Sequence, residues 1–247
     1  MHQQDSPSNR PTPVSADTRE ANQRQDHFGS REAIWLFGYG SLIWKADFAY
    51  RARRPALIEG YARRFWQGSH DHRGTPEAPG RVATLIHQPG ARCLGMAYLI
   101  GPEVLAPLDL REKNGYLRER VTLHFLDETN PLDENHPRDD SNPLDDHHQQ
   151  NTDSRLTVDA LATARTAEGL VYIAGDANPA YLGDASDDSI AEQIAHAHGP
   201  SGPNSDYLLH LADALHAMGG EDDHVFGLAA ALRRRMRQAA THPATTD

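Results

Sequence analysis

Cysteine is nearly absent from this chain, since Cys93 is the only one among 247 residues. A single cysteine excludes an intramolecular disulfide and a zinc site built from several thiolates. Cys93 lies in an apolar run, where a small buried hydrophobic residue is favoured over a reactive thiol. This cysteine usage favours a reducing compartment, and we expect a cytoplasmic protein.

Long apolar runs are also missing. Residues 1–25 are polar throughout, and no run approaches the roughly 20 apolar residues of a transmembrane helix. We therefore expect no signal peptide and no membrane partner. Hydrophobic residues make up 38% of the chain, a low share for a globular protein, so part of the chain is expected to be unstructured.

Basic residues are outnumbered, with 24 Lys and Arg against 35 Asp and Glu and a net charge of −11. Much of the excess lies in residues 127–153, which contain nine acidic residues and one base, Arg138. The rest of the chain has no basic stripe of the size that binds nucleic acid. Its longest basic run, Arg233-Arg234-Arg235, suits the end of a helix, where positive charge interacts favourably with the helix dipole. We expect no nucleic-acid partner.

The composition divides the chain into regions. Residues 1–31, rich in Gln, Ser, Pro and Thr, predict a disordered tail. Residues 32–238 predict one domain, interrupted by a low-complexity acidic insert at about 127–168. In the insert His147 and His148 lie among aspartates, where a solvated loop is favoured over a weak metal site.

Apolar patterning predicts the elements of the domain. Strands are expected at residues 34–37, 56–65, 82–86, 93–100, 117–126 and 169–174, with a short helix at 103–110. Apolar stripes at helical spacing predict helices over 187–198, 205–218 and 222–236. Strands followed by helices indicate an α+β domain, whose sheet we expect to curl into a small barrel.

The most informative segment runs from Leu36 to Trp44, Leu-Phe-Gly-Tyr-Gly-Ser-Leu-Ile-Trp. A buried strand ends there in a turn with glycine on both sides of Tyr39. Such a turn can aim consecutive N–H groups at an anion or an oxyanion. The alternative is a plain turn that follows a buried strand.

Several named motifs do not fit this segment. A dinucleotide fingerprint needs glycine where Ile43 stands, and the Gly-Lys-Ser/Thr ending of a phosphate loop is missing. A nucleophile elbow needs glycines where Tyr39 and Ile43 flank Ser41. Ser41 is therefore a poor candidate for an acyl-transfer nucleophile, and backbone geometry is the better hypothesis.

The second informative segment is Leu108 to Tyr116, in which Glu112 stands between Arg111 and Lys113 and before Asn114-Gly115. One interpretation is a solvated charge at the end of a helix. The other is a general base at the mouth of a cavity near the glycine-containing turn. Spacing alone favours the first.

A resemblance changes that balance. Eight segments, in order along the chain, closely resemble the ChaC-like family of glutathione-specific γ-glutamylcyclotransferases. They are Phe37–Trp44, Arg64–Ser69, Asp71–Gly74, Pro79–Val82, Arg111–Lys113, Asn178–Gly183, Ile190–Ile194 and Gly199–Gly202. The resemblance covers about residues 34–236 without the acidic insert. It implies a small mixed β-barrel with flanking and C-terminal helices.

The family reaction that this resemblance implies cyclises the γ-glutamyl group of glutathione to 5-oxoproline and releases Cys-Gly. It implies Glu112 as the catalytic acid/base and a main-chain substrate loop, with no cofactor and no metal. The substrate-binding residues that it implies are Leu36, Phe37, Gly38, Tyr39, Gly40, Ser41, Leu42, Arg81, Glu103, Tyr116 and Tyr181. Arg81 is expected to pair with the glycine carboxylate, Glu103 to lie on a mobile flap, and plain packing is the alternative for both tyrosines.

Two rival functions stay open. One is the same chemistry on another γ-glutamyl amine or γ-glutamyl amino acid. The other is a non-catalytic module that binds γ-glutamyl compounds. The sequence leaves the oligomeric state undetermined.

Overall fold

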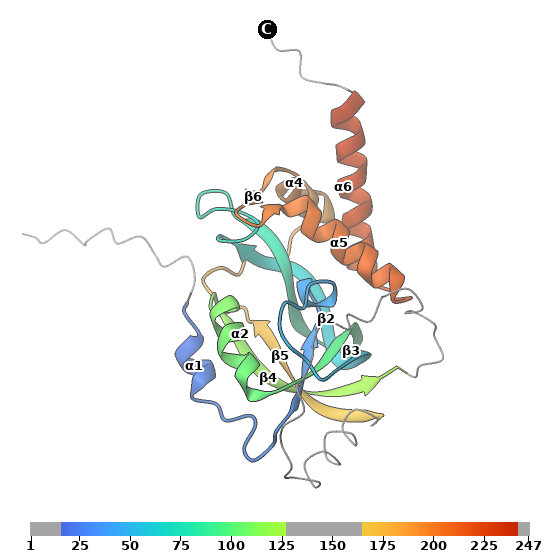
Figure 1. The fold of residues 1–247 in the computed structure, drawn as a ribbon. Helices are drawn as coiled ribbons and strands as arrows, with labels where there is room; N and C mark the ends of the chain where they lie inside the picture. The colour runs from blue at the N-terminus through green and yellow to red at the C-terminus, as the bar shows by residue number, and fades with distance from the viewer. Residues whose placement is uncertain (1–15, 127–164, 242–247) are drawn as a thin grey trace, which may run out of the picture.

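The computed structural model describes residues 16–126 and 165–241, and its centre is a closed five-stranded barrel (Figure 1). The strand order around the barrel is β1-β3-β2-β4-β5. The bounds are β1 Ile34–Gly38, β2 Ala52–Ser69, β3 Gly80–Ile100, β4 Tyr116–Phe125 and β5 Thr166–Ala174. Strand β1 runs parallel to β5, whereas every other neighbouring pair is antiparallel. The predicted α+β class with a small mixed barrel is confirmed.

Large apolar side chains fill the barrel because alternate residues of its strands point inward. Trp35 of β1 is completely buried and packs against Phe125 of β4, with ring centroids 4.7 Å apart. Phe65, Tyr98 and Leu123 are also fully buried. This core holds β1 rigidly, and the glycine-containing turn follows directly from that strand.

One strand prediction was wrong. Residues 82–86 and 93–100 were expected to form separate strands, yet both belong to β3, which continues for 21 residues. The polar stretch between them is exposed and opposes Gly60 of β2 across a shift in register. An irregularity of this size, with residues 88–91 opposite Gly60 alone, leaves the two strands paired on both sides of the polar stretch, which explains why the sequence pattern resembled a loop.

Helices cover two sides of the barrel (Figure 1). The last three, α4 Asp187–His196, α5 Asn204–Ala217 and α6 Asp223–Thr241, lie together beside β2 and β3, as Figure 1 shows. A small hairpin of β6 His198–Gly199 and β7 Gly202–Pro203 connects α4 to α5. On the other side are η2 Pro102–Val104 and α2 Leu105–Arg111, while η1 Ser41–Ile43 follows β1. No helix within the described residues is long and apolar enough to cross a membrane.

Part of the predicted disordered tail is folded. Residues 16–31 include α1, Arg19–Gln23, which packs beside α2. Asn22 is fully buried there, and its side chain accepts from the N–H of Arg118 (2.9 Å) and donates to the carbonyl of Tyr116 (3.0 Å). A polar segment can therefore be ordered by hydrogen bonds to main-chain groups, which a composition argument does not detect. Residues 1–15, and the predicted insert as far as residue 164, lie outside the described residues.

Candidate active site

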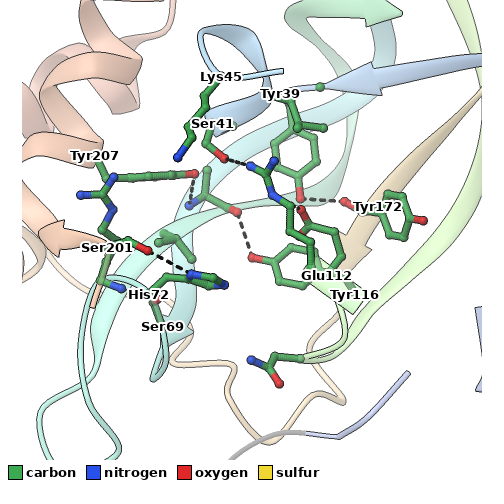
Figure 2. Close-up of a pocket in the computed structure, with 18 of the residues that line it drawn as sticks. Tyr39, Ser41, Lys45, Ser69, His72, Glu112, Tyr116, Tyr172, Ser201 and Tyr207 are labelled. Atoms are coloured by element: carbon green, nitrogen blue, oxygen red, sulfur yellow. Dashed lines mark hydrogen bonds and ion pairs between the residues drawn. The ribbon is translucent and has the colours of Figure 1, made fainter. Parts of the chain in front are cut away.

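A cavity of about 450 Å³ opens at the end of β1, between α2 and the start of α5 (Figure 2). Its walls come from the turn after β1, the link between β2 and β3, the end of α2 and Tyr207 of α5. Glu112, Tyr116, Tyr39 and Tyr172 lie on one side of the cavity in Figure 2. The opposite side carries Tyr207, Ser201 and His72.

The turn after β1 presents unpaired N–H groups to the cavity. Gly40, Ser41 and Leu42 line the cavity, and their N–H groups donate to no other described residue. The turn is fixed from behind because Arg63 donates from Nε to the carbonyl of Tyr39 (2.7 Å). Arg63 is itself held by a buried ion pair with Asp222 (2.6 Å). Consecutive free N–H groups on a fixed turn form a preorganised anion or oxyanion site.

The two glycines of this turn are required by close approach. Neither Gly38 nor Gly40 has a positive φ. A Cβ atom at position 38 would lie 2.5 Å from Cβ of Leu42, and one at position 40 would lie 2.8 Å from the hydroxyl of Tyr207. Glycine therefore lets the turn tighten against Leu42 and lets Tyr207 reach the cavity wall.

Helix α2 ends at the site. Glu112 is its C-cap residue, and its side chain is 19% exposed where it lines the cavity. Arg111 extends three ways: to Asp47 (Nη1 to Oδ1, 2.6 Å), to Ser41 (Nη2 to Oγ, 2.8 Å) and to Glu112 (Nε to Oε1, 3.3 Å). This arginine ties the carboxylate of Glu112 to the turn after β1.

Burial raises the pKa of Glu112 above its usual value, because a charged carboxylate loses solvation in the cavity. Arg111 opposes this effect, whereas the nearby carboxylates of Asp71 and Asp47 add to it. A carboxylate with a raised pKa is a stronger base than an exposed one. Glu112 is thus suited to accepting a proton from a group bound in the cavity.

Four tyrosines line the cavity: Tyr39, Tyr116, Tyr172 and Tyr207. Burial raises the pKa of each hydroxyl, to about 12 for Tyr207, so all four stay protonated at neutral pH. The hydroxyl of Tyr39 donates to the carbonyl of Tyr172 (2.8 Å), and that of Tyr172 donates to Asp109 (2.7 Å). The phenols therefore give the cavity a neutral, hydrogen-bonding wall.

The structure brings most of the expected site residues together. Glu112, Tyr116 and residues 37–42 all line the same cavity, although they come from three separate segments. Leu36 does not line it, and its side chain is fully buried in the hydrophobic core.

Three expected binding residues lie outside the cavity lining. Arg81 is buried and donates to Gln193 (2.7 Å) and to the carbonyls of Phe65 (3.0 Å) and Gly183 (2.9 Å), so its expected pairing with a substrate carboxylate does not fit this geometry. Glu103 lies in η2, directly before α2, and is exposed to solvent. Tyr181 packs against Trp66 with ring centroids 6.4 Å apart, in keeping with the packing alternative.

Sequence reasoning missed other residues of the lining. They include Lys45, Asp47, His72, Arg73, Asn114, Tyr172, Ser201 and Tyr207. His72 and Arg73 lie in Asp71–Gly74, one of the segments that carry the family resemblance, but no role was predicted for either residue. No local sequence pattern marks Tyr172 or Tyr207 as a site residue. Tyr172 belongs to the apolar run of a predicted strand, and Tyr207 lies at the start of a predicted helix with an apolar stripe.

Comparison with known proteins decides the family. The family model described as ChaC-like protein matches residues 34–235. The chain belongs to the ChaC-like family. Gamma-glutamylcyclotransferase 2-3 of Arabidopsis thaliana is 39% identical over 215 residues, which cover 84% of this chain and 92% of that protein. The human glutathione-specific gamma-glutamylcyclotransferase 1 is 34% identical over 240 residues, covering 94% and 92%.

A solved structure agrees with the family assignment. The crystal structure of the selenomethionine-labelled γ-glutamyl cyclotransferase specific to glutathione from yeast superimposes with a TM-score of 0.65 and 31% identity. The match covers 83% of this chain and 97% of the yeast chain. Every residue of the cavity lining falls inside the ChaC-like region, whereas α1 lies before it. Asn22 of α1 contacts the matched region at Tyr116 and Arg118.

Proposed function

We propose that this protein cleaves glutathione by cyclising its γ-glutamyl group, which gives 5-oxoproline and Cys-Gly. The observation that supports it most directly is that the carboxylate of Glu112 lines the same cavity as the free N–H groups of the turn at Gly40 to Leu42. Relatives that carry this activity in their names match more than four fifths of the chain.

The substrate supplies its own nucleophile. The α-amine of the glutamyl unit attacks the γ-carbonyl carbon of the same unit, a C–N bond forms and a five-membered ring closes. The amide bond to cysteine then breaks, and the amine of Cys-Gly leaves. Holding the glutamyl unit folded makes the attack intramolecular, which removes most of the entropic cost of bringing the two groups together.

One carboxylate is sufficient for the proton transfers. Glu112 accepts the proton that the attacking amine loses and returns it to the nitrogen of the leaving cysteine, so the enzyme ends the cycle unchanged. The raised pKa of Glu112 makes its carboxylate a better acceptor for the proton of the attacking amine. Its burial keeps that proton from water until it is returned to the leaving nitrogen.

The turn stabilises the charge that develops on the γ-carbonyl oxygen. The N–H groups at Gly40, Ser41 and Leu42 are held before substrate arrives, so no reorganisation is needed during the reaction. The phenols of Tyr39 and Tyr116 lie on the side of Glu112 in Figure 2, and because they stay protonated they add no negative charge near the glutamyl end.

The test is to incubate the purified protein with glutathione and, separately, with γ-glutamyl-alanine, and to measure 5-oxoproline and released Cys-Gly. We expect turnover of glutathione and little turnover of the dipeptide. Preference for γ-glutamyl-alanine would favour cyclotransferase chemistry on other γ-glutamyl compounds. Binding of glutathione without any 5-oxoproline would favour a non-catalytic binding module.

Replacement of the base separates chemistry from binding. Glu112→Gln keeps the shape of the side chain but cannot accept the proton, so we expect kcat to fall by about 100-fold or more while glutathione still binds. Glu103→Gln, at an exposed position outside the cavity, is the matched control and should retain full activity. Near-normal rates for Glu112→Gln would remove Glu112 as the base.

The proposed setting is the cytoplasm. Within the described residues Cys93 is a free thiol, and a chain without a disulfide suits a reducing compartment. The proposed small-molecule substrate there is glutathione.

A further inference from the structure

Two of the three cations that line the cavity are not paired with its three carboxylates, Asp47, Asp71 and Glu112. Lys45, Arg73 and Arg111 all line it. Arg111 is fully engaged by Asp47, Ser41 and Glu112. Lys45 and Arg73 form no ion pair with any carboxylate of the described residues.

These two cations belong to the side of the cavity away from Glu112. The guanidinium of Arg73 lies over the ring of Tyr207, 5.9 Å from its centroid, and donates to the carbonyl of Pro203 (3.0 Å). Lys45 follows Trp44, whose ring packs edge-on against the same Tyr207 (5.6 Å between centroids). Figure 2 shows the Lys45 side chain extending into the cavity on the side of Tyr207, with Glu112 on the other side.

The rest of this end is polar and held in place. The N–H of Ser201 donates to the carbonyl of His72 (2.9 Å), and the Ser201 hydroxyl lies 3.2 Å from Nδ1 of His72. The backbone N–H of Arg73 donates to the hydroxyl of Ser69 (2.9 Å). The link between β2 and β3 is thus joined to the β6–β7 hairpin beside Lys45 and Arg73.

We propose that Lys45 and Arg73 form the subsite for the glycine carboxylate of the tripeptide, which rests on the proposed function. The α-carboxylate and the attacking amine of the glutamyl unit are bonded to the same α-carbon, so this carboxylate must stay near Glu112. The glycine carboxylate is the only other anionic group of the substrate at neutral pH, and it lies at the opposite end of an extended tripeptide. Lys45 and Arg73 therefore take over the role that the sequence suggested for Arg81.

The experiment compares glutathione with the same tripeptide in which the glycine carboxylate is a primary amide. This change removes one charge and leaves the reacting groups intact. For the unaltered enzyme we expect kcat/KM to be about tenfold higher for the acid, the size of one charge-assisted hydrogen bond. Lys45→Met should abolish most of this preference by raising KM for the acid, while kcat and the constants for the amide stay within about twofold.

Matched variants control for charge and for folding. Lys45→Arg keeps the charge and should keep the preference for the acid. Lys113→Met removes the other lysine of the chain, whose side chain does not line the cavity, and should also keep it. Arg73→Gln retains a donor for the carbonyl of Pro203 and should lower the preference as Lys45→Met does. A thermal melt shows whether each variant is folded.

If Lys45→Met lowered kcat/KM equally for the acid and the amide, the proposal would be overturned, because Lys45 would then interact with a part of the tripeptide that both substrates have. An unchanged preference in both Lys45→Met and Arg73→Gln would also overturn it. If glutathione is bound but not cleaved, the proposed reaction fails, and the same comparison by titration calorimetry still tests the subsite. A preference for binding the acid that depends on Lys45 would then support the subsite alone.

Discussion

Nε of Arg111 lies 3.3 Å from Oε1 of Glu112, in a cavity whose burial acts on the same carboxyl in the opposite direction. Burial raises the pKa of Glu112, and Arg111 lowers it. The working pH range of the proposed base is therefore set by the balance between these two effects.

This balance predicts the acid limb of the pH–rate profile. The base must be ionised, so kcat/KM should fall as the pH drops through the pKa of Glu112. Arg111→Gln removes the opposing charge, raises that pKa further, and should move the acid limb to higher pH. Arg233→Gln, which removes an exposed charge on α6, should leave the limb in place. A limb that stays fixed or moves to lower pH in Arg111→Gln would contradict the assignment.

The same carboxyl predicts a stability effect. The pKa of Glu112 is higher in the folded protein than the usual value of 4.5, so the folded state binds this proton more tightly. Stability from this group is present below pH 4.5 and is lost as the pH rises through the folded-state pKa. Glu112→Gln stays neutral, so its Tm should exceed that of the unaltered protein at pH 7 to 8.

Melting curves recorded across pH check this stability effect. The difference in Tm should vanish below pH 4.5, where Glu112 is protonated in both states. A variant that is less stable than the unaltered protein at pH 7 would show that the ion pair with Arg111 outweighs the cost of burial.

Local signals in the sequence predicted the elements that carry the proposed chemistry. The apolar strand before Gly38 and the helix before Glu112 are both visible in residue patterns, and their meeting in one cavity follows from closure of the barrel. The burial of Arg81 outside the cavity lining could not be predicted, because the sequence does not show which neighbours will surround a charged side chain. Tyr207 was missed because only the folded chain brings α5 against the turn after β1.

The turn itself predicts a steric effect at Gly40. An added Cβ would lie 2.8 Å from the hydroxyl of Tyr207, so Gly40→Ala must displace that ring from the cavity wall. We expect kcat/KM for glutathione to fall by about tenfold or more, as small misplacements of binding groups do. Gly175→Ala, where nothing lies within 4 Å of the added carbon, is the matched control. Equal activities of the two variants would show that Tyr207 does not need its present position.

Helix α1 predicts a stability effect outside the ChaC-like match. Asn22→Ala leaves the buried N–H of Arg118 without its acceptor, and the carbonyl of Tyr116 loses one of its donors. Unpaired buried groups cost about 1–3 kcal/mol, so we expect a loss of about 2 kcal/mol, or roughly 4–8 °C in Tm. Glu20→Ala on the exposed face of α1 should change stability by less than about 0.5 kcal/mol. A similar Tm for both variants would show that α1 contributes little to folding.

Arg81 predicts a structural effect where a binding role was expected. Its guanidinium is buried and joins Gln193 of α4 to the carbonyls of Phe65 and Gly183, and no carboxylate of the described residues pairs with it. Arg81→Gln cannot reach all three acceptors, so we expect a loss of about 3 kcal/mol of stability. The KM for glutathione, measured well below the Tm of the variant, should stay within about twofold. Arg237→Gln, at an exposed position of α6, controls for the lost charge. If KM rose tenfold while Tm stayed constant, Arg81 would have to reach the substrate, and it would compete with Lys45 and Arg73 as the partner of the glycine carboxylate.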